Sequence, residues 1–392
     1  MSNELSFTVL CEDCDDRKED LQQRGYELVG ACAEDKGQPG MCVIRYRRAA
    51  AAAGAAAAMG TVAVRDAAAT ALAAESFDEP AATATQASAA KAIVNLFETG
   101  QVLGDYGAVT VLPGDTGHLT YGRSQTTLGS GNLAVLVDRY CTQPGARFGS
   151  RLRDWRASLK ARDRALDRDQ QLHNLLRACA DDPVMRDVQD RFFDDSYWQP
   201  AVRAAARLGI RFPLGVAIVY DGWVHGSWGA MRERTERGGT VQRSGEKEWL
   251  ERYVDTRRDW LAGHPNLLLR KTVHRMDAFR GLMDQGYWGL ELPLVVRGRE
   301  ISLATLSGMP PGCYDGPHPG TRPLAVQSPL NRGLDVRLLQ LGLSLADHQC
   351  DIRADGIFGS TTARWVARYQ QGNGLPQTGV ADPALVARLA TV

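Results

Sequence analysis

The 392-residue chain lacks the features that identify several common classes of protein. No uninterrupted apolar run is long enough to span a bilayer, so stable membrane insertion is not expected. The first residues lack the basic start and apolar core of a signal peptide, which predicts a route of export other than the general one. No zinc-protease, nucleotide-phosphate or dinucleotide motif is present, and no serine lies in a nucleophile elbow. We therefore expect no cofactor.

Cysteine is too scarce for a disulfide scaffold in a chain of this length, with eight residues in total. Half of them lie in the first 42 residues and could supply four thiolates to a zinc ion: Cys11, Cys14, Cys32 and Cys42. Nine residues separate the last two, which is not the usual tight spacing, so plain thiols or a disulfide are the alternatives. The other four are expected to be buried thiols, or at best one disulfide: Cys141, Cys179, Cys313 and Cys350.

Net charge is also absent, since 46 Lys and Arg balance 46 Asp and Glu. The balance is uneven, because residues 88–310 carry 31 basic against 26 acidic residues, a net of +5. A mildly basic region suits an anionic polymer better than a polycation. The Arg-rich stretch 147–168 alternates with Asp, which is typical of a solvated helix face and does not indicate a nucleic-acid partner.

Composition divides the chain into five parts. Residues 1–48 form a small α/β unit of unknown role, followed by an Ala-rich linker at 49–87. Residues 88–310 form a mainly helical domain, and a Pro/Gly-rich linker covers 311–330. Residues 331–392 form a compact helical module.

The helical domain is predicted from its apolar periodicity. The apolar run at 212–220 is expected to be its central buried helix. Further helices are predicted at 133–141, 169–180, 184–196, 199–208 and 249–261, and the highly charged stretch 151–164 is expected at the surface. The fold class is thus mainly α, with one small β-hairpin formed by 109–112 and 118–121.

Two carboxylates flank the start of this domain. Glu98 ends an amphipathic helix just before Thr99-Gly100, and Asp115 follows in a Gly-rich turn of the predicted hairpin. Hydrolysis of a glycosidic bond needs one acid to protonate the leaving oxygen and a second carboxylate on the opposite face of the sugar. The alternative is that Glu98 is solvated and Asp115 only forms the turn.

The same residues resemble a known catalytic block. Glu98, sixteen residues, Asp115, four residues, Thr120, one residue and Gly122 resemble the family 46 glycoside hydrolases, which are chitosanases. The resemblance implies a lysozyme-like fold and an inverting mechanism. It also implies that Glu98 is the general acid, that Asp115 is the general base, and that Thr120 helps to position the water.

The resemblance extends further along the chain. Tyr220-Asp221 before a His-Gly turn is similar to a family helix whose Asp shares an arginine with the catalytic Glu. Arg275 is the candidate for that arginine, and the alternative is that it lies on a solvated surface. Four residues are candidates for lining the sugar sites: Tyr106, Tyr121, Gln125 and Thr126.

The C-terminal module resembles the three-helix peptidoglycan-binding domains attached to cell-wall hydrolases. The match rests on Asp355-Gly356, Phe358-Gly359 and Thr362, together with flanking Leu, Gln and Gly positions. The aromatic side chains Phe358 and Trp365 are expected to belong to its core rather than to contact a ligand.

These observations predict a bacterial peptidoglycan hydrolase that cleaves β-1,4 bonds between amino sugars. Gly117 replaces the arginine common in the chitosanases, and the basic domain does not suit polycationic chitosan. A chitosanase is the first alternative, and a catalytically inactive wall-binding or delivery protein is the second. An antibacterial effector, with an immunity protein or secretion component as partner, and a phage-type lysin both fit a protein made in the cytoplasm that acts in the periplasm or cell wall.

Overall fold

The computed structural model describes residues 82–112, 117–123 and 125–390, apart from the side chain of Leu268, together with four N-terminal strands as backbone. These strands are β1 (Glu4–Leu10), β2 (Tyr26–Leu28), β3 (Ala33–Glu34) and β4 (Met41–Arg48). They form an antiparallel sheet in the order β1-β4-β2, and β3 also pairs with β4. The zinc hypothesis falls outside the residues whose side chains are described, and it stays a prediction for Cys11, Cys14, Cys32 and Cys42.

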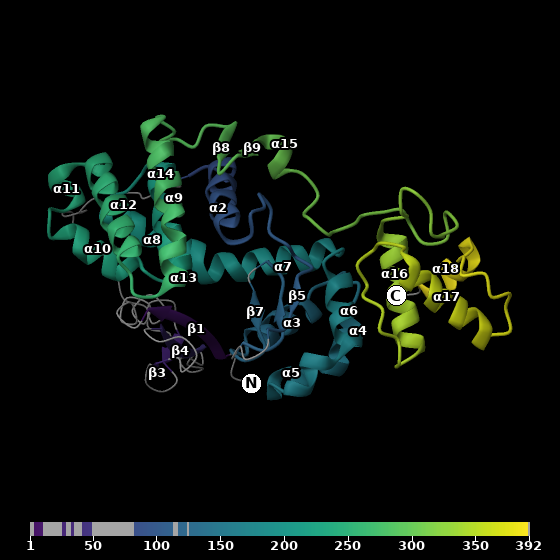
Figure 1. Ribbon diagram of the computed structural model, residues 1–392. Coiled ribbons are helices and arrows are strands. Elements are labelled where there is room, and N and C mark those ends of the chain that lie inside the picture. The colour runs from purple at the N-terminus through teal and green to yellow at the C-terminus, as the bar shows by residue number, and fades with distance from the viewer. Residues whose placement is uncertain are drawn as a thin grey trace, which may run out of the picture.

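The central domain is mainly helical, which confirms the predicted fold class (Figure 1). Its helices of nine or more residues are α2 (Ala84–Thr99), α3 (Asn132–Cys141), α6 (Gln170–Cys179), α7 (Pro183–Phe193), α8 (Gln199–Leu208), α9 (Pro213–His225), α10 (Trp228–Glu236), α12 (Glu246–Ala262) and α14 (His274–Asp284). Shorter helical segments are α4 (Gly149–Leu152), η2 (Arg153–Trp155), α5 (Arg156–Ala161), η3 (Arg164–Arg168), the π-helical η4 (Asp194–Trp198), α11 (Val241–Ser244), α13 (Leu267–Arg270), η5 (Lys271–Val273) and α15 (Leu303–Leu306). Its strands are β5 (Val109–Thr110), β6 (Thr120–Tyr121), β7 (Thr126–Thr127), β8 (Leu294–Val296) and β9 (Arg299–Ile301). No helix in the described parts of the chain is both long and apolar enough to cross a membrane.

Helix α2 is defined at both ends by local chemistry. Thr83 caps its N-terminus in a reciprocal arrangement, because its side chain accepts from the Gln86 N–H while the Gln86 side chain accepts from the Thr83 N–H. Gly100 ends the helix with a φ of 72°, a left-handed conformation that glycine adopts without strain. Glu98 therefore lies in the last turn of a well-defined helix, one residue before its end at Thr99.

Helix α9 is the central buried helix that the apolar run predicts. Every residue from Leu214 to Trp223 is buried, including Asp221. Pro213 starts the helix, and Gly226 follows its end with a φ of 80°. An aliphatic run that is apolar on every side has no polar face to expose, and α9 accordingly packs between α2 and α8.

The Arg-rich stretch at 147–168, whose alternating charges are typical of a solvated helix face, does not form one continuous helix. It is divided into the short segments α4, η2, α5 and η3. Arg162 takes a left-handed φ of 56° directly after α5, which ends the helix there. Neither proline nor glycine marks this break, so helical periodicity alone could not predict it.

The C-terminal module (residues 331–390 here) contains α16 (Leu334–Ala346), α17 (Ser360–Gly372) and α18 (Pro383–Leu389). Phe358 and Trp365 belong to its hydrophobic core, as predicted. The module lies against the central domain, where α16 packs beside α6 (Figure 1). The four cysteines outside the N-terminal unit are buried free thiols: Cys141, Cys179, Cys313 and Cys350.

A buried carboxylate lies where the module meets the central domain. Asp181 Oδ1 accepts a hydrogen bond from the Tyr314 N–H at 2.7 Å and lies 3.4 Å from Arg337 Nη1. Oδ2 has no hydrogen-bond partner among the described residues. Burial raises the pKa of Asp181 to about 6, although Arg337 opposes this shift.

We expect this carboxylate to make the protein less stable as the pH rises from 4 to 7. The folded protein holds the Asp181 proton more tightly than the unfolded chain does, so the stabilisation is present below about pH 4 and is lost through about pH 6, by on the order of 1–3 kcal/mol. Melting temperatures measured across this range should fall with rising pH in wild type and in Asp187→Asn, whose substituted side chain is mostly exposed. In Asp181→Asn this contribution to the fall should be missing. Equal slopes in wild type and Asp181→Asn would contradict the expectation.

Candidate active site and a second pocket

Glu98 is held at the end of α2 by an arginine from another helix. Arg275, in the first turn of α14, donates from Nη2 to Glu98 Oε1 and from Nη1 to Asp221 Oδ1, the latter at 2.8 Å. The Arg275 side chain is 5% exposed, whereas 40% of the Glu98 side chain remains exposed. The structure thus places Arg275 between the two carboxylates, and Glu98 is the member of the group that can reach a ligand.

A second arginine completes the buried part of this group. Arg257, on α12, donates from Nη1 to Asp221 Oδ2 at 2.7 Å, and both side chains are fully buried. Burial alone would raise the pKa of Asp221, but the Arg257 and Arg275 guanidiniums hold it below its usual value. Burial would lower the pKa of Arg275, but Asp221 and Glu98 raise it. Asp221 therefore has an arginine on each of its oxygens, and one of them, Arg275, also holds the exposed Glu98.

Sequence reasoning missed Arg257, although a signal for it exists. The buried side of α12 includes Leu250, Val254, Arg257 and Leu261 at helical spacing. An arginine within such an apolar stripe needs a buried anionic partner. Asp221, which follows the apolar run directly and lies in the same buried helix α9, is the matching carboxylate.

The other half of the predicted site lies on the small sheet. Strands β5, β6 and β7 pair in that order, so the predicted hairpin gains a third strand. Thr120 is partly exposed on β6, and its hydroxyl donates to the His118 carbonyl at 3.1 Å. Asp115 lies in the β5–β6 turn outside the described residues, so its role as general base stays a prediction.

Three of the four candidates for lining the sugar sites are buried, which does not favour them as sugar contacts. Tyr121 and Thr126 are 0% and 4% exposed. They are register partners on β6 and β7, and their shared face packs on the core while Thr120 points to the other face. Tyr106 is also buried, and its hydroxyl donates to Asp190 Oδ1 at 2.7 Å. Gln125 is exposed and stays a candidate.

A second polar cluster connects the small sheet to α2. Arg123, just after β6, donates to Asp190 Oδ1, to the Tyr106 hydroxyl at 3.3 Å and to Asn95 Oδ1 at 3.3 Å. Asn95 lies on α2 one turn before Glu98. No periodicity or spacing in the sequence marks Arg123, because its partners come from three separate segments.

Gly122, between Thr120 and Arg123, is required by close packing and by its backbone. Its φ is 75°, and a Cβ there would lie 2.2 Å from Gln189 Oε1. That oxygen also accepts from the Arg123 N–H at 3.0 Å. Gly122→Ala should therefore displace Gln189 and destabilise the protein by about 2–4 kcal/mol.

Thermal melting of a matched variant checks this expectation. Gly209 also has a positive φ, of 77°, but no atom lies within 4 Å of its Cβ position. Gly209→Ala should cost only the backbone strain, about 1–2 kcal/mol. A melting temperature for Gly122→Ala equal to that of Gly209→Ala would show that the contact with Gln189 is unimportant.

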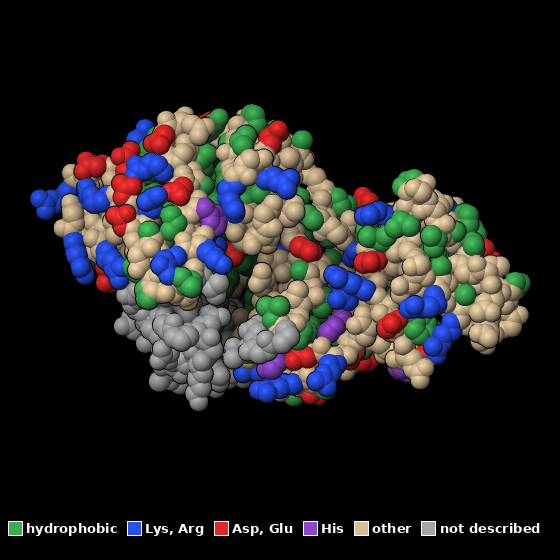
Figure 2. Space-filling model, viewed as in Figure 1, with side chains coloured by type: hydrophobic (Ala, Val, Ile, Leu, Met, Phe, Trp, Pro, Cys, Tyr) green, Lys and Arg blue, Asp and Glu red, His purple; other side chains and the backbone are tan. Residues whose placement is uncertain are grey.

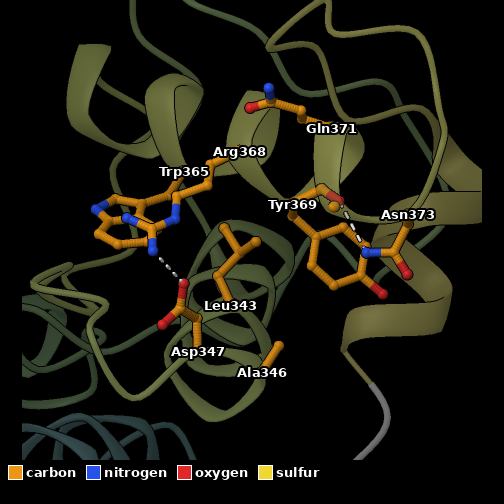
Figure 3. Close-up of a pocket in the computed structure, with 9 residues that line it drawn as sticks. Leu343, Ala346, Asp347, Trp365, Arg368, Tyr369, Gln371 and Asn373 are labelled. Carbon is orange, nitrogen blue, oxygen red and sulfur yellow. Dashed lines mark hydrogen bonds and ion pairs between the residues drawn. The ribbon is translucent and has the colours of Figure 1, made fainter.

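Apart from the candidate active site, a pocket of about 370 Å³ lies on the C-terminal module between the last turns of α16 and α17. Figure 3 shows Tyr369, Arg368 and Asn373 around it. The Arg368 guanidinium lies 4.7 Å from the Trp365 ring centroid and pairs with Asp347 at 3.0 Å. The pocket thus combines aromatic surface with amide groups and a balanced ion pair, a suitable lining for an uncharged sugar ring.

The structure thus brings together an exposed glutamate, a buried group of arginines and an aspartate behind it, and a small sheet connected to the same helix. Residues 92–294, more than half of the chain, match the model of glycosyl hydrolase family 46, and the chain belongs to this family. Residues 332–389 match the model described as a putative peptidoglycan binding domain.

Individual relatives are chitosanases. The chain is 27% identical over 226 residues to the chitosanase of Bacillus subtilis strain 168, covering 54% of this chain and 81% of the relative. It resembles the solved native chitosanase of Bacillus subtilis MY002 with a TM-score of 0.46 and 27% identity, covering 56% of this chain and 96% of that one. A complex of the Gynuella sunshinyii family 46 chitosanase with chitotetraose gives a TM-score of 0.47 and 27% identity, covering 57% and 98%.

Proposed function

We propose that this glycoside hydrolase cleaves β-1,4 bonds between amino sugars with Glu98 as the general acid. The observation that carries the proposal is the position of Glu98, which is partly exposed at a helix end and fixed from behind by Arg275 and Asp221. In this proposal Asp115 activates a water molecule that Thr120 helps to position. A base acting on water rather than on the sugar inverts the anomeric centre.

Chitosan is the substrate that the relatives support best, ahead of the peptidoglycan that the sequence favoured. The relatives at 27% identity are chitosanases. The net charge of the domain is a weak argument against chitosan, because it does not show which charges face the substrate. Arg123, Arg257 and Arg275, for example, all point inward into ion pairs.

Peptidoglycan remains the second candidate because of the C-terminal module. A binding module raises the local concentration of its polymer at the active site. The full-length protein should be incubated with chitosan and with purified peptidoglycan, and products identified by reducing-end release and mass spectrometry. We expect glucosamine oligosaccharides whose first-formed reducing ends are α-anomers by NMR, and no product with Glu98→Gln. Release from neither polymer by the folded protein would contradict the proposal.

The pocket on the module is our candidate for polymer binding. In a Glu98→Gln background, Arg368→Met should reduce co-sedimentation with peptidoglycan about tenfold, the scale of a binding hot spot. Arg364→Met is a matched control on the same helix, since Arg364 pairs with Asp351 at 3.6 Å and does not line the pocket. Equal binding by both variants would place the binding surface elsewhere on the module.

A role as an antibacterial effector or a phage-type lysin depends on peptidoglycan cleavage. The support for it is the combination of a glycosidase domain with a module of the peptidoglycan-binding family. Clearing of a peptidoglycan suspension by wild type and not by Glu98→Gln is the result that this role requires. Cleavage of chitosan alone would contradict it and leave an enzyme that degrades chitosan.

A further inference from the structure

The C-terminal module packs on the central domain through a shared hydrophobic core. Leu334, Leu338 and Leu341 of α16 belong to the same cluster of buried residues as Leu172 and Leu175 of α6. The space-filling view shows the two parts in continuous contact (Figure 2). A module that served only as a tethered anchor would not need to bury one of its own helices in this way.

Asn174, on α6, fixes the position of the C-terminal module on the central domain. It is fully buried, and its Nδ2 donates to Ser344 Oγ at 3.0 Å and to the Ile352 carbonyl at 2.8 Å. Its Oδ1 accepts from the Ala354 N–H at 2.9 Å and from Arg177 Nη1 at 3.1 Å. All four hydrogen-bonding positions of the amide are used, and three of the partners belong to the module. Sliding the module would leave this buried amide unpaired, so the contact has one favoured register.

Arg337, on α16, joins the module to both the linker and α6. Its Nη1 donates to the Arg177 carbonyl at 2.7 Å, and its Nη2 donates to the Gly312 carbonyl at 2.6 Å. The guanidinium also lies 4.8 Å from the ring centroid of Tyr314 in the linker. One side chain therefore fixes the end of α6 and the linker at the same time.

The linker in turn contacts the segment that leads into the small sheet. Cys313 packs with Tyr106 and Ala180 in one buried cluster. Tyr106 hydrogen bonds Asp190 on α7 and Arg123, and Arg123 connects the sheet to α2 through Asn95. The small sheet that carries Thr120 is thus connected through Arg123 to α2 and through Arg123 and Tyr106 to the linker.

We propose that the C-terminal module is a fixed part of the catalytic unit, and that Arg337 and Asn174 are positioning residues for the small sheet that carries Thr120. This proposal rests on the proposed function for its effect on catalysis. It differs from the usual role of a binding module, because it predicts an effect on short soluble substrates. A tethered anchor would change only the cleavage of insoluble polymer.

The test uses the full-length protein and a soluble glucosamine hexamer. Arg337→Met should lower kcat at least fivefold with KM changed less than twofold, and Arg337→Lys should recover part of the loss. Arg364→Met, an exposed arginine of the same module, should match wild type. Asn174→Ala provides a second disruption of the interface, and circular dichroism gives the folded fraction by which each rate is corrected.

Two results would overturn the proposal. One is a kcat on the hexamer, corrected for the folded fraction, that equals the wild-type value in both Arg337→Met and Asn174→Ala, while the rate of cleavage falls only on insoluble polymer. The other is rapid hydrogen exchange in wild type at the Ala354 N–H, which a fixed contact with Asn174 must protect. If wild type cleaves neither polymer, the proposed function and the effect on turnover both fail, and the exchange measurement alone decides whether the module is fixed.

Discussion

Glu98→Gln is expected to lower kcat by about 10²–10⁴-fold, the usual contribution of a general acid. The amide keeps the size of the side chain and can still accept the hydrogen bond from Arg275, so folding and substrate binding should change little. The amide cannot deliver a proton to the leaving oxygen. Initial rates of reducing-end release, measured from low to saturating substrate, separate the loss in kcat from any change in KM.

A second glutamate provides the control for this substitution. Glu300, on β9, is exposed, and Glu300→Gln should retain the wild-type rate. Near-wild-type activity in Glu98→Gln would remove Glu98 from the chemistry. If wild type is itself inactive and Glu98→Gln leaves wall binding unchanged, the protein is a binding or delivery protein and the catalytic interpretation is wrong.

Asp221→Asn should be among the most destabilising single substitutions in the central domain. It neutralises the partner of Arg257 in a fully buried ion pair, and among the described residues it leaves Arg275 paired with Glu98 alone. Breaking a buried ion pair by neutralising one partner typically costs about 3–5 kcal/mol, because the remaining charge stays buried without compensation. Chemical unfolding followed by tryptophan fluorescence suits this test, since Trp223, Trp228 and Trp249 lie in the same core.

The matched control is an aspartate in an exposed pair. Asp277 accepts from Arg258 at 2.7 Å, and both side chains are about half exposed. Asp277→Asn should change the unfolding free energy by less than about 0.5 kcal/mol. Similar losses in the two variants would mean that burial of Asp221 adds nothing, and that the relay behind Glu98 is not held as the structure indicates.

The parts of the site that could be predicted from the sequence are those with local signals. The end of α2 at Thr99-Gly100 placed Glu98 at a helix terminus, and the all-apolar run of α9 identified a buried helix that contains Asp221. Arg275 could be assigned only through the family resemblance. Its partners lie 177 and 54 residues away along the chain, and such contacts have no local signature.

Other features depend on tertiary contacts that the sequence does not reveal. Strand β7 consists of Thr126 and Thr127 only, and it exists because β6 is there to pair with it. Tyr121 and Tyr106 are candidates for lining the sugar sites in the sequence, but strand alternation buries Tyr121 and the contact with Asp190 holds Tyr106 inward. Arg123 is one of 46 basic residues, and only its three partners distinguish it.

The docking of α16 on α6 also limits where the enzyme can work once it has attached to a solid polymer. A catalytic domain joined to its binding module by a flexible linker could reach polymer on all sides of each point of attachment. With the module held on the central domain, the catalytic residues would reach only the bonds near one point of attachment, and cutting elsewhere would require dissociation and rebinding. Tighter binding by the module would therefore slow degradation of a solid polymer once the nearby bonds are cut. The fastest degradation would be expected at a moderate binding affinity.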